Sequence, residues 1–301
     1  DDLFIAGYVN DPSEADQLGS GKTLIYDHPI RQVCFSWDVF RLNPGEIEAD
    51  FALLATNKKS QAIDDPHTCQ YGDKIFLEEG VHIKAAVLNA EDGPIYFGKN
   101  VKISEGSIVR GPTALCEGSQ LSMGAKVRGN VTVGPYSKIG GEVSNAVLQG
   151  YSNKSHDGYL GSSVVGEWCN LGAATNNSNL KNNYGKVKMW NFANRQFRDS
   201  GLQFCGLIMG DHTRCAINTT FNTGTTTGIM SNIFGAGFHR NFIPSFSWGG
   251  TGGFATYQFE KAVESAERAM IRREQRFSEE ERGILRHIFE TTATDRTWEL
   301  K

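Results

Sequence analysis

The sequence contains no hydrophobic run near the ~20 residues that a membrane-spanning helix needs. It also has no excess of basic residues, since 30 Lys and Arg stand against 34 Asp and Glu. Residues 1–4 lack the basic-then-apolar pattern of a secretory signal. With 301 residues, 39% hydrophobic and 21% charged, the composition is typical of a folded globular domain. We therefore expect neither a membrane nor a nucleic acid as a partner.

Cysteine motifs are absent as well. The six cysteines form no C-x-x-C pair, and no histidine lies at zinc-finger spacing from them, so no structural metal site is expected. Without a signal sequence, we expect the thiols to be reduced and the protein to be cytoplasmic.

Proline is scarce, with 8 residues, whereas glycine is abundant, with 34, and this accompanies a repeat. Starting at Phe97, every sixth residue is large and apolar for eight residues in succession: Phe97, Ile103, Val109, Leu115, Leu121, Val127, Val133 and Ile139. The residues four positions later are small or β-branched: Val101, Ser107, Thr113, Ser119, Ala125, Val131, Ser137 and Val143. The frame returns at Met209, Cys215, Phe221, Thr227 and Ile233, with Thr213, Thr219, Thr225, Ser231 and Gly237 four later.

A period of six fits neither an α-helix nor a simple alternating strand. It fits a flat coil in which each hexad supplies one short strand and one turn, with the large residue pointing inward. Stacked coils of this kind bury a continuous core that no single repeat could bury alone. The sequence therefore predicts a mainly β protein built on a β-solenoid.

The flanks have a different pattern. In 43–56, an N-cap (Asn43), a first-turn proline (Pro44) and Glu46 precede Ile47, Phe51 and Leu54 on one face, which predicts a helix. Residues 57–74 are expected to form a polar linker. Segments 145–160 and 176–206 break the hexad frame and are expected to leave the solenoid wall, where binding sites are often built.

After the glycine-rich segment 249–253, the pattern turns helical. Phe259, Val263, Ala266 and Met270 follow helical spacing, and a capping box at 278–281 begins a last helix. The arginines of this region, at 268, 272, 273 and 276, are expected to form a solvated helix face.

Three motifs lie close together inside 151–185. They are Ser-His-Asp-Gly-Tyr-Leu-Gly around His156, Gly-Glu-Trp-Cys-Asn-Leu-Gly-Ala around Asn170, and Asn-Leu-Lys-Asn-Asn-Tyr-Gly from Asn179. They resemble the acetyltransferase domain of the bifunctional N-acetylglucosamine-1-phosphate uridyltransferase/glucosamine-1-phosphate N-acetyltransferase family. From about Trp37 onward, the chain is most similar to the Bacteroidetes-type branch of that family, the sugar nucleotidyltransferases.

This resemblance implies a left-handed parallel β-helix with about 18 residues per coil, flanked by N- and C-terminal helices. It divides the chain into an N-terminal segment and linker helix (1–74), the acyltransferase β-helix (75–250) and C-terminal helices (251–301). It also implies a homotrimer, with active sites between neighbouring β-helices. The implied ligands are acetyl-CoA, as co-substrate, and an amino-sugar 1-phosphate similar to glucosamine 1-phosphate. Such an enzyme would take part in the synthesis of UDP-N-acetylglucosamine, which is used to build the cell envelope.

The resemblance places the general base at His156, which would take a proton from the sugar amino group as its nitrogen attacks the thioester. Histidine suits this role because its ordinary pKa of ~6.5 leaves it mostly neutral yet still basic near neutral pH. The implied substrate-binding residues are Arg128, Glu142, Tyr159, Asn170, Asn179, Asn183 and Lys186, with Asn179 and Asn183 as alternatives for one family position. The implied contacts to acetyl-CoA are Ala173, Gly235 and Arg240.

Two departures from the family pattern stand out. Ser144 replaces a phosphate-binding lysine, and the CoA-binding arginine has only Arg240 as a candidate. The nucleotidyltransferase half is also unrecognisable, because the segment 19–23 lacks the full phosphate-loop spacing. The first ~35 residues resemble the tail of that missing domain, and Mg²⁺ is expected only if the domain is active.

Three functions remain open at this point: an N-acetyltransferase, the trimerising and regulatory part of a sugar-1-phosphate nucleotidyltransferase, and a non-catalytic solenoid. His156 with Glu142 and Tyr159 favours the first, whereas Ser144 keeps the second open. Thiol release from acetyl-CoA in the presence of amino-sugar phosphates would separate them.

Overall fold

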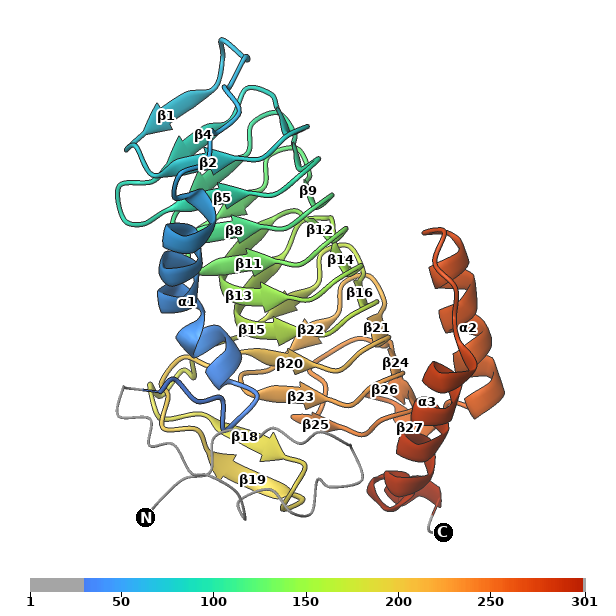
Figure 1. Ribbon diagram of the computed structural model, residues 1–301. Coiled ribbons are helices and arrows are strands. Elements are labelled where there is room, and N and C mark those ends of the chain that lie inside the picture. Colours follow the sequence, from blue (N-terminus) through green and yellow to red (C-terminus); the bar gives the residue numbers. More distant parts are fainter. Residues whose placement is uncertain (1–29, 300–301) are drawn as a thin grey trace, which may run out of the picture. The chain divides into compact units, whose positions relative to one another are not determined.

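The structure is a computed structural model that describes residues 30–299 (Figure 1). The elements below belong to the compact unit that begins at Val33. The segment 19–23 and most of the predicted N-terminal remnant lie outside the described residues.

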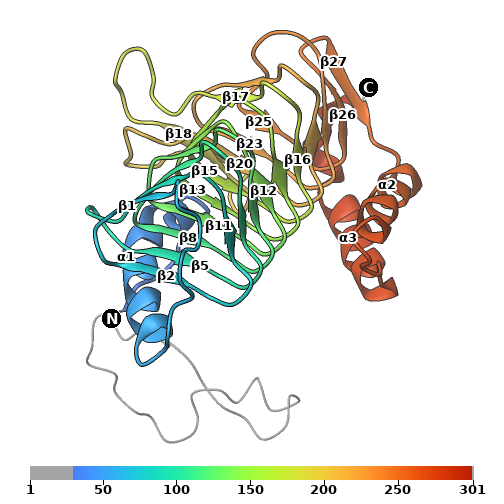
Figure 2. The same cartoon turned by 90° about the horizontal axis from the view of Figure 1, so that it is seen from above.

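Short strands form three parallel ladders, here called walls 1 to 3 (Figures 1 and 2). Wall 1 contains β1 (Cys69–Tyr71), β4 (Val87–Asn89), β7 (Ile108–Arg110), β10 (Lys126–Val127) and the first halves of β13 (Glu142–Leu148) and β15 (Tyr159–Val165). The pair β17 (Asn176–Asn177) and β22 (Thr220–Phe221) continues this side of the coils. Strand β1 shows that the first coil begins inside the segment predicted as linker.

Wall 2 contains β2 (Ile75–Leu77), β5 (Ile95–Phe97), β8 (Thr113–Leu115), β11 (Val131–Val133), the second halves of β13 and β15, β20 (Leu207–Met209), β23 (Thr225–Thr227) and β25 (Phe242–Ile243). Wall 3 contains β3 (His82–Ile83), β6 (Lys102–Ile103), β9 (Gln120–Leu121), β12 (Lys138–Ile139), β14 (Asn153–Lys154), β16 (Asn170–Leu171), β21 (Arg214–Cys215), β24 (Asn232–Ile233) and β26 (Ser247–Gly250). The chain visits walls 1, 2 and 3 in turn, which confirms the predicted parallel β-solenoid.

The hexad residues form the core of this solenoid. The eight large residues from Phe97 to Ile139 are each at most 2% exposed, and the small residues four positions later are also buried. The second run, from Met209 to Ile233, is buried too, although Gly237 at its end is exposed. The six-residue period therefore predicted the inward side chains, except at this last position.

The corner between walls 2 and 3 is constant from coil to coil. The inward side chains on its two sides keep the hexad spacing, from Leu115 to Leu121 and equally from Met209 to Cys215. Left-handed backbone recurs at this corner at Tyr136, Tyr151, Trp168, His212, Met230 and Phe246, with φ between 55° and 58°. The first four rings stack on one another, the Tyr151 and Trp168 centroids being 4.2 Å apart. We call this column of corner residues the spine.

The other two corners vary in length. Thr113 pairs with Ile95 in the coil before it and with Val131 in the coil after it, so these two coils are equally long. In contrast, Val133 pairs with Leu148, and Leu148 pairs with Val165, so the next two coils are both shorter, the first of them more so. The predicted excursion at 145–160 is therefore wrong, because these residues stay in the walls and only the coils are shorter.

The predicted excursion at 176–206 is confirmed in part. Its first two residues, in β17, still pair within the solenoid, and the chain then leaves wall 1 before it returns to wall 2 at β20. Between these points it forms an antiparallel hairpin from β18 (Lys188–Asn191) and β19 (Gln196–Asp199).

Helix α1 (Asp38–Ala55) packs on wall 2. The predicted start at Asn43 is wrong: the Asp38 carboxylate accepts hydrogen bonds from the backbone of Cys34 and Phe35, and the helix begins there. The Asn43 side chain is buried and instead contacts wall 2, donating to the Asn130 carbonyl and accepting from Thr132. Leu54, predicted on the packed face, is exposed.

The C-terminal region confirms the helical spacing. All four residues predicted on the apolar face of α2 (Phe259–Ile271) are buried, and Ser278 and Glu281 form both hydrogen bonds of the capping box of α3 (Glu279–Thr291). The glycine-rich segment before α2 is the turn of a hairpin between β26 and β27 (Gly253–Thr256), which the sequence did not indicate. Short turns η2 (Ala293–Asp295) and η3 (Thr297–Glu299) follow. Within residues 30–299, no helix has the length and apolar character to span a bilayer.

Candidate functional site

Four of the predicted substrate residues meet on wall 1. Glu142 begins β13 and Tyr159 begins β15, and the two residues are register partners. Arg128 follows β10 on the same wall and donates a hydrogen bond from its guanidinium to Glu142 Oε1 at 2.9 Å. Asn179 donates from Nδ2 to the Tyr159 hydroxyl at 3.1 Å. Residues from four separate stretches of sequence thus converge; we call them the wall 1 cluster.

The electrostatics of the wall 1 cluster keep its charges fixed. The hydrogen bond and charge of Glu142 raise the pKa of Arg128. Burial raises the pKa of the Tyr159 phenol, against the opposing effect of the hydrogen bond from Asn179. Near neutral pH the cluster therefore offers a protonated phenol beside an arginine–carboxylate ion pair.

The asparagine-rich loop supports this cluster from the next coil. Asn179 also contacts Ser162 Oγ at 3.2 Å, whereas Asn183 is exposed and accepts a hydrogen bond from the Gly185 backbone. Of the two alternatives left open by the sequence, only Asn179 contacts another member of the cluster in the described part of the chain.

Two neighbouring asparagines hold the start of β15. Asn176 Oδ1 accepts from the Tyr159 backbone, and the buried Asn177 side chain bonds to both the N–H and the carbonyl of Gly161. Sequence reasoning missed both roles. Their signal is the run Asn176-Asn177-Ser178-Asn179, where short amide side chains can replace backbone partners.

His156 lies at the corner between β14 on wall 3 and β15 on wall 1, with an exposed side chain. Its backbone carbonyl accepts a hydrogen bond of 2.6 Å from Lys154 Nζ. The proposed base is thus close in sequence to Tyr159, at the edge of the wall that carries the cluster.

Lys154 is a second residue that sequence reasoning missed. It is 1% exposed and pairs with Ile139, so that an amine occupies an inward position of the hexad core. Burial lowers the pKa of Lys154 to about 8, against the opposing effect of the Asp157 charge. The shorter coil hid this residue, because the six-residue frame restarts at a different position.

The remaining predicted residues lie apart from the wall 1 cluster. Asn170 is exposed on wall 3, between Asn153 and Arg214 in the ladder. Ala173 lies in the following corner, where its carbonyl accepts from the Asn218 backbone, and the exposed Lys186 offers its carbonyl to Lys181. Gly235 follows β24 with a φ of 109°.

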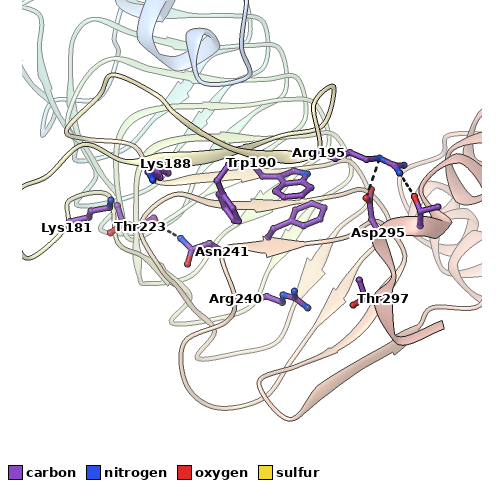
Figure 3. Close-up of a pocket in the computed structure, with 12 residues that line it drawn as sticks. Lys181, Lys188, Trp190, Arg195, Thr223, Arg240, Asn241, Asp295 and Thr297 are labelled. Carbon is purple, nitrogen blue, oxygen red and sulfur yellow. Dashed lines mark hydrogen bonds and ion pairs between the residues drawn. The ribbon is translucent and has the colours of Figure 1, made fainter. Parts of the chain in front are cut away.

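Arg240 lines a cavity of about 760 Å³ between the β18–β19 hairpin, the last coils and the C-terminal turns (Figure 3). Trp190 of the hairpin stacks on Phe242 with ring centroids 3.9 Å apart. The other basic residues around this aromatic floor are Lys181, Lys188 and Arg195. Arg195 pairs with Asp295 at 3.6 Å, so the C-terminal turn closes one side.

A second cavity of about 700 Å³ shares Arg240 and Thr297 with the first. His239 lines it and is 3% exposed, and neither of its ring nitrogens has a hydrogen-bond partner among the described residues. Burial lowers the pKa of His239, which keeps the ring neutral. In the first cavity, the buried Nε1 of Trp190 also lacks a partner within this part of the chain.

Comparison with known proteins begins with a negative result, because no protein-family model matches the chain. The bifunctional sugar-1-phosphate nucleotidylyltransferase/acetyltransferase of Sulfurisphaera tokodaii is 30% identical over 168 residues, which are 52% of this chain and 37% of that protein. The bifunctional protein GlmU of Synechococcus elongatus is 26% identical over 181 residues, 56% of this chain and 39% of that protein. The chain is thus homologous to these proteins over about half of its length and spans less than two-fifths of theirs.

Solved structures give a weaker likeness. The polySia-specific acetyltransferase NeuO matches with a TM-score of 0.35 and 13% identity, over 66% of this chain and 87% of that one. The Arabidopsis UDP-N-acetylglucosamine acyltransferase matches with a TM-score of 0.30 and 14% identity, over 67% of this chain and 76% of that one. Both TM-scores are too low to support an inference about function.

Among residues 30–299, no group of three or more His, Cys, Asp or Glu side chains could hold a metal ion.

Proposed function

We propose that this chain is an N-acetyltransferase that transfers the acetyl group of acetyl-CoA to the amino group of an amino-sugar 1-phosphate. The observation that carries the proposal is the convergence of Arg128, Glu142, Tyr159 and Asn179 on wall 1, beside the corner that presents His156. The sequence relatives, whose names include an acetyltransferase, support it.

In the proposed reaction, the sugar amine nitrogen attacks the thioester carbonyl carbon. A C–N bond forms, the C–S bond breaks, and CoA leaves as the thiolate. His156 accepts the proton that the nitrogen loses, so its exposed imidazole must be neutral when the acceptor binds. Tyr159 and Glu142 would hold hydroxyl groups of the sugar, because they supply a neutral donor and an acceptor on one wall.

Recognition of the phosphate requires positively charged side chains near the wall 1 cluster. Arg128 is engaged with Glu142 through one guanidinium nitrogen, and Ser144 stands where the resembled family has a lysine. Arginine has five N–H donors in a planar fork, so Arg128 retains others for a phosphate oxygen. Lys186, exposed in the long loop, is the second cation assigned to the phosphate.

The residues around Arg240 fit the anionic nucleotide end of CoA. Four cations surround the Trp190–Phe242 stack. The Trp190 Nε1–H donor and both ring nitrogens of His239, one a donor and one an acceptor when the ring is neutral, lack a partner among the described residues. An aromatic floor with cations at its edge is suited to a nucleobase and its phosphates. Ala173 and Gly235 complete the set assigned to this ligand.

We further assign the active form as a homotrimer with the site shared between subunits. Asn170 lies on wall 3, whereas the cluster lies on wall 1, and α1 covers part of wall 2. Wall 3 of one subunit facing wall 1 of the next would bring Asn170 to the cluster. Sedimentation at micromolar concentration measures this directly, and a monomer would contradict the shared site.

The test of the function is thiol release from acetyl-CoA with a panel of amino-sugar 1-phosphates, with the non-phosphorylated amino sugars as controls. We expect turnover with a phosphorylated acceptor and a rise of the melting temperature with acetyl-CoA alone. No turnover, together with a melting-temperature rise produced only by a nucleoside triphosphate, would favour the regulatory part of a nucleotidyltransferase instead.

A further inference from the structure

Several corners between walls 3 and 1 share one device for satisfying their backbone. In these coils, the residue after the inward hydrophobic residue of wall 3 begins the corner, and its carbonyl accepts a hydrogen bond from a hydroxyl. The Ser107 hydroxyl donates to the Ser104 carbonyl at 2.7 Å, Thr175 donates to Gly172 at 2.6 Å, and Thr219 donates to Ala216 at 2.7 Å. A hydroxyl at the fourth corner position thus closes the corner.

The corner that presents His156 cannot use this device. It runs through residues 155–158, and its fourth residue is Gly158, which has no hydroxyl. A larger side chain does not fit there, because a Cβ on Gly158 would lie 2.0 Å from the Thr175 carbonyl oxygen. The preceding coil has only Gly140 and Gly141 at this corner, so it offers no hydroxyl either.

Lys154 supplies hydrogen bonds to both corners from inside the solenoid. One goes to Gly140, at the position whose carbonyl a hydroxyl bonds in the other coils, and one goes to His156, one residue beyond the equivalent Ser155. The Lys154 Nζ donates to the Gly140 carbonyl at 3.2 Å and to the His156 carbonyl at 2.6 Å. The ammonium therefore joins the corners of two successive coils, in a region where other coils use serine or threonine.

Packing does not explain a lysine at this position. The equivalent residues in the coils on either side are Ile139 and Leu171, both buried and apolar. Burial of an amine is unfavourable unless it is well hydrogen-bonded, and an aliphatic side chain would fill the same space without that cost. The position is better explained by the two carbonyls.

The rest of the corner is held from outside the core. The Glu142 N–H donates to the Gly158 carbonyl, and the Ala174 N–H donates to the Asp157 carbonyl. Lys154 contacts the first half of the corner, at His156 itself.

We propose that Lys154 is a positioning residue, whose buried ammonium fixes the backbone at His156 and thereby holds the imidazole beside the wall 1 cluster. The role of Lys154 in turnover rests on the proposed acetyltransferase function. Its role in ordering the corner does not, which allows the two to fail separately.

The experiment compares Lys154→Met with Ser107→Ala as the matched control. Methionine keeps the length and burial of the side chain but removes the donor. Ser107→Ala removes a hydroxyl that contacts the carbonyls of Ser104 and Ser122 in two successive coils with no assigned role. Hydrogen exchange is followed by mass spectrometry on peptides that cover 104–108, 140–144, 155–160 and 172–176. Turnover is measured as kcat and as KM for each substrate.

In Lys154→Met we expect exchange to rise at least tenfold at the N–H groups of Glu142, Tyr159 and Ala174, which donate hydrogen bonds at or next to this corner. Corners other than this one and the linked corner at Gly140 should keep wild-type protection. We expect kcat to fall about tenfold or more, with the KM for acetyl-CoA unchanged, because the change displaces the base and not the cofactor site. Ser107→Ala should loosen only the corners that its hydroxyl contacts and leave kcat within twofold of wild type.

Wild-type exchange at Glu142, Tyr159 and Ala174 in a folded Lys154→Met protein would overturn the proposal. A loosened corner with unchanged kcat would overturn the positioning role in turnover. If the wild type turns over no acceptor, the proposed function fails, and the exchange result still decides whether Lys154 orders the corner. Should Lys154→Met not fold, Lys154→Leu is measured instead, because leucine occupies the equivalent inward position of the next coil, at Leu171, and has no donor. Wild-type exchange at Glu142, Tyr159 and Ala174 with full kcat would overturn the proposal there.

Discussion

The coils from Phe97 to Ile139 and those from Glu142 to Leu171 differ in what they place inside. The first set keeps a constant coil length and fills its interior with aliphatic and aromatic side chains, closing corners with small residues. The second set has shorter coils of unequal length, buries Lys154 inside, and carries the wall 1 cluster outside.

The residues removed from the shorter coils come from corners. Ile139 and Val143, which are inward on walls 3 and 1, are closer in sequence than Leu121 and Val127, their counterparts in the coil before. Gly141 adopts a φ of 67°, and a Cβ there would lie 2.6 Å from the Gly158 carbonyl oxygen. A strand that lost residues would also lose its pairing with the neighbouring coils. The coils are therefore shortened at their turns, and polar contacts replace regular apolar packing there.

The largest expected effect in the irregular coils is on rate. His156→Ala should lower kcat by roughly 10² to 10⁴, the usual contribution of a positioned general base. The wild-type rate should fall toward acidic pH, because an imidazolium cannot accept a proton, and the variant should lose that dependence. Thiol-release kinetics from pH 5 to 9, with thermal melting as the folding control, measure both.

Wild-type turnover in His156→Ala would refute the assignment of the base. A variant that does not fold would show that the corner needs this side chain for stability, which is not expected of an exposed side chain.

In the regular coils the expected effect is on stability. Leu121→Ala should destabilise the protein by about 2–5 kcal/mol, because it leaves a cavity in a fully packed core. Met123→Ala, at an exposed corner of the same coil, is the matched control and should stay within about 0.5 kcal/mol. Urea unfolding measures both variants. If Leu121→Ala lost kcat while keeping wild-type stability, the regular coils would contribute to turnover and not to stability, which would contradict the difference between the two sets of coils.

A smaller effect links pH to the buried amine. Burial lowers the pKa of Lys154 from 10.5 to about 8, so between these pH values the unfolded chain binds more protons than the folded one. Stability therefore rises with pH through this window, by about 3 kcal/mol at ~1.4 kcal/mol per pH unit. The buried thiols of Cys169 and Cys215, whose pKa values burial raises, act in the opposite direction.

The measurement is therefore the difference in unfolding free energy between wild type and Lys154→Met at pH 7.5 and pH 10. The wild type should gain stability relative to the variant as pH rises. An unchanged difference would mean that Lys154 is not buried as a charged group.

The sequence predicted the regular coils well because the hexad depends on side-chain volume, which is known for each residue from its type alone. It could not predict the short coils, since the shortened corner at Gly140 shifts the frame and makes wall residues look like a loop. The same shift concealed Lys154.

Elsewhere, long-range contacts decided the outcome. Asn43 has the local pattern of an N-cap, but its side chain bonds to Asn130 and Thr132, and Asp38 begins the helix instead. Among the site residues, the family resemblance indicated Arg128, Glu142, Tyr159 and either Asn179 or Asn183, and the first three lie together with Asn179. The cavity beside Trp190 could not be foreseen, because it depends on how the hairpin folds back over the last coils.

The spine gives the solenoid an axis that does not change with coil length. Tyr151, Trp168 and His212 remain stacked, although a short coil joins the first pair and the coil that carries the β18–β19 hairpin joins the second. Length is therefore free to change only at the other two corners, where a hairpin has been added and residues have been lost. New loops can be acquired there coil by coil, while the spine keeps every wall aligned with its neighbours.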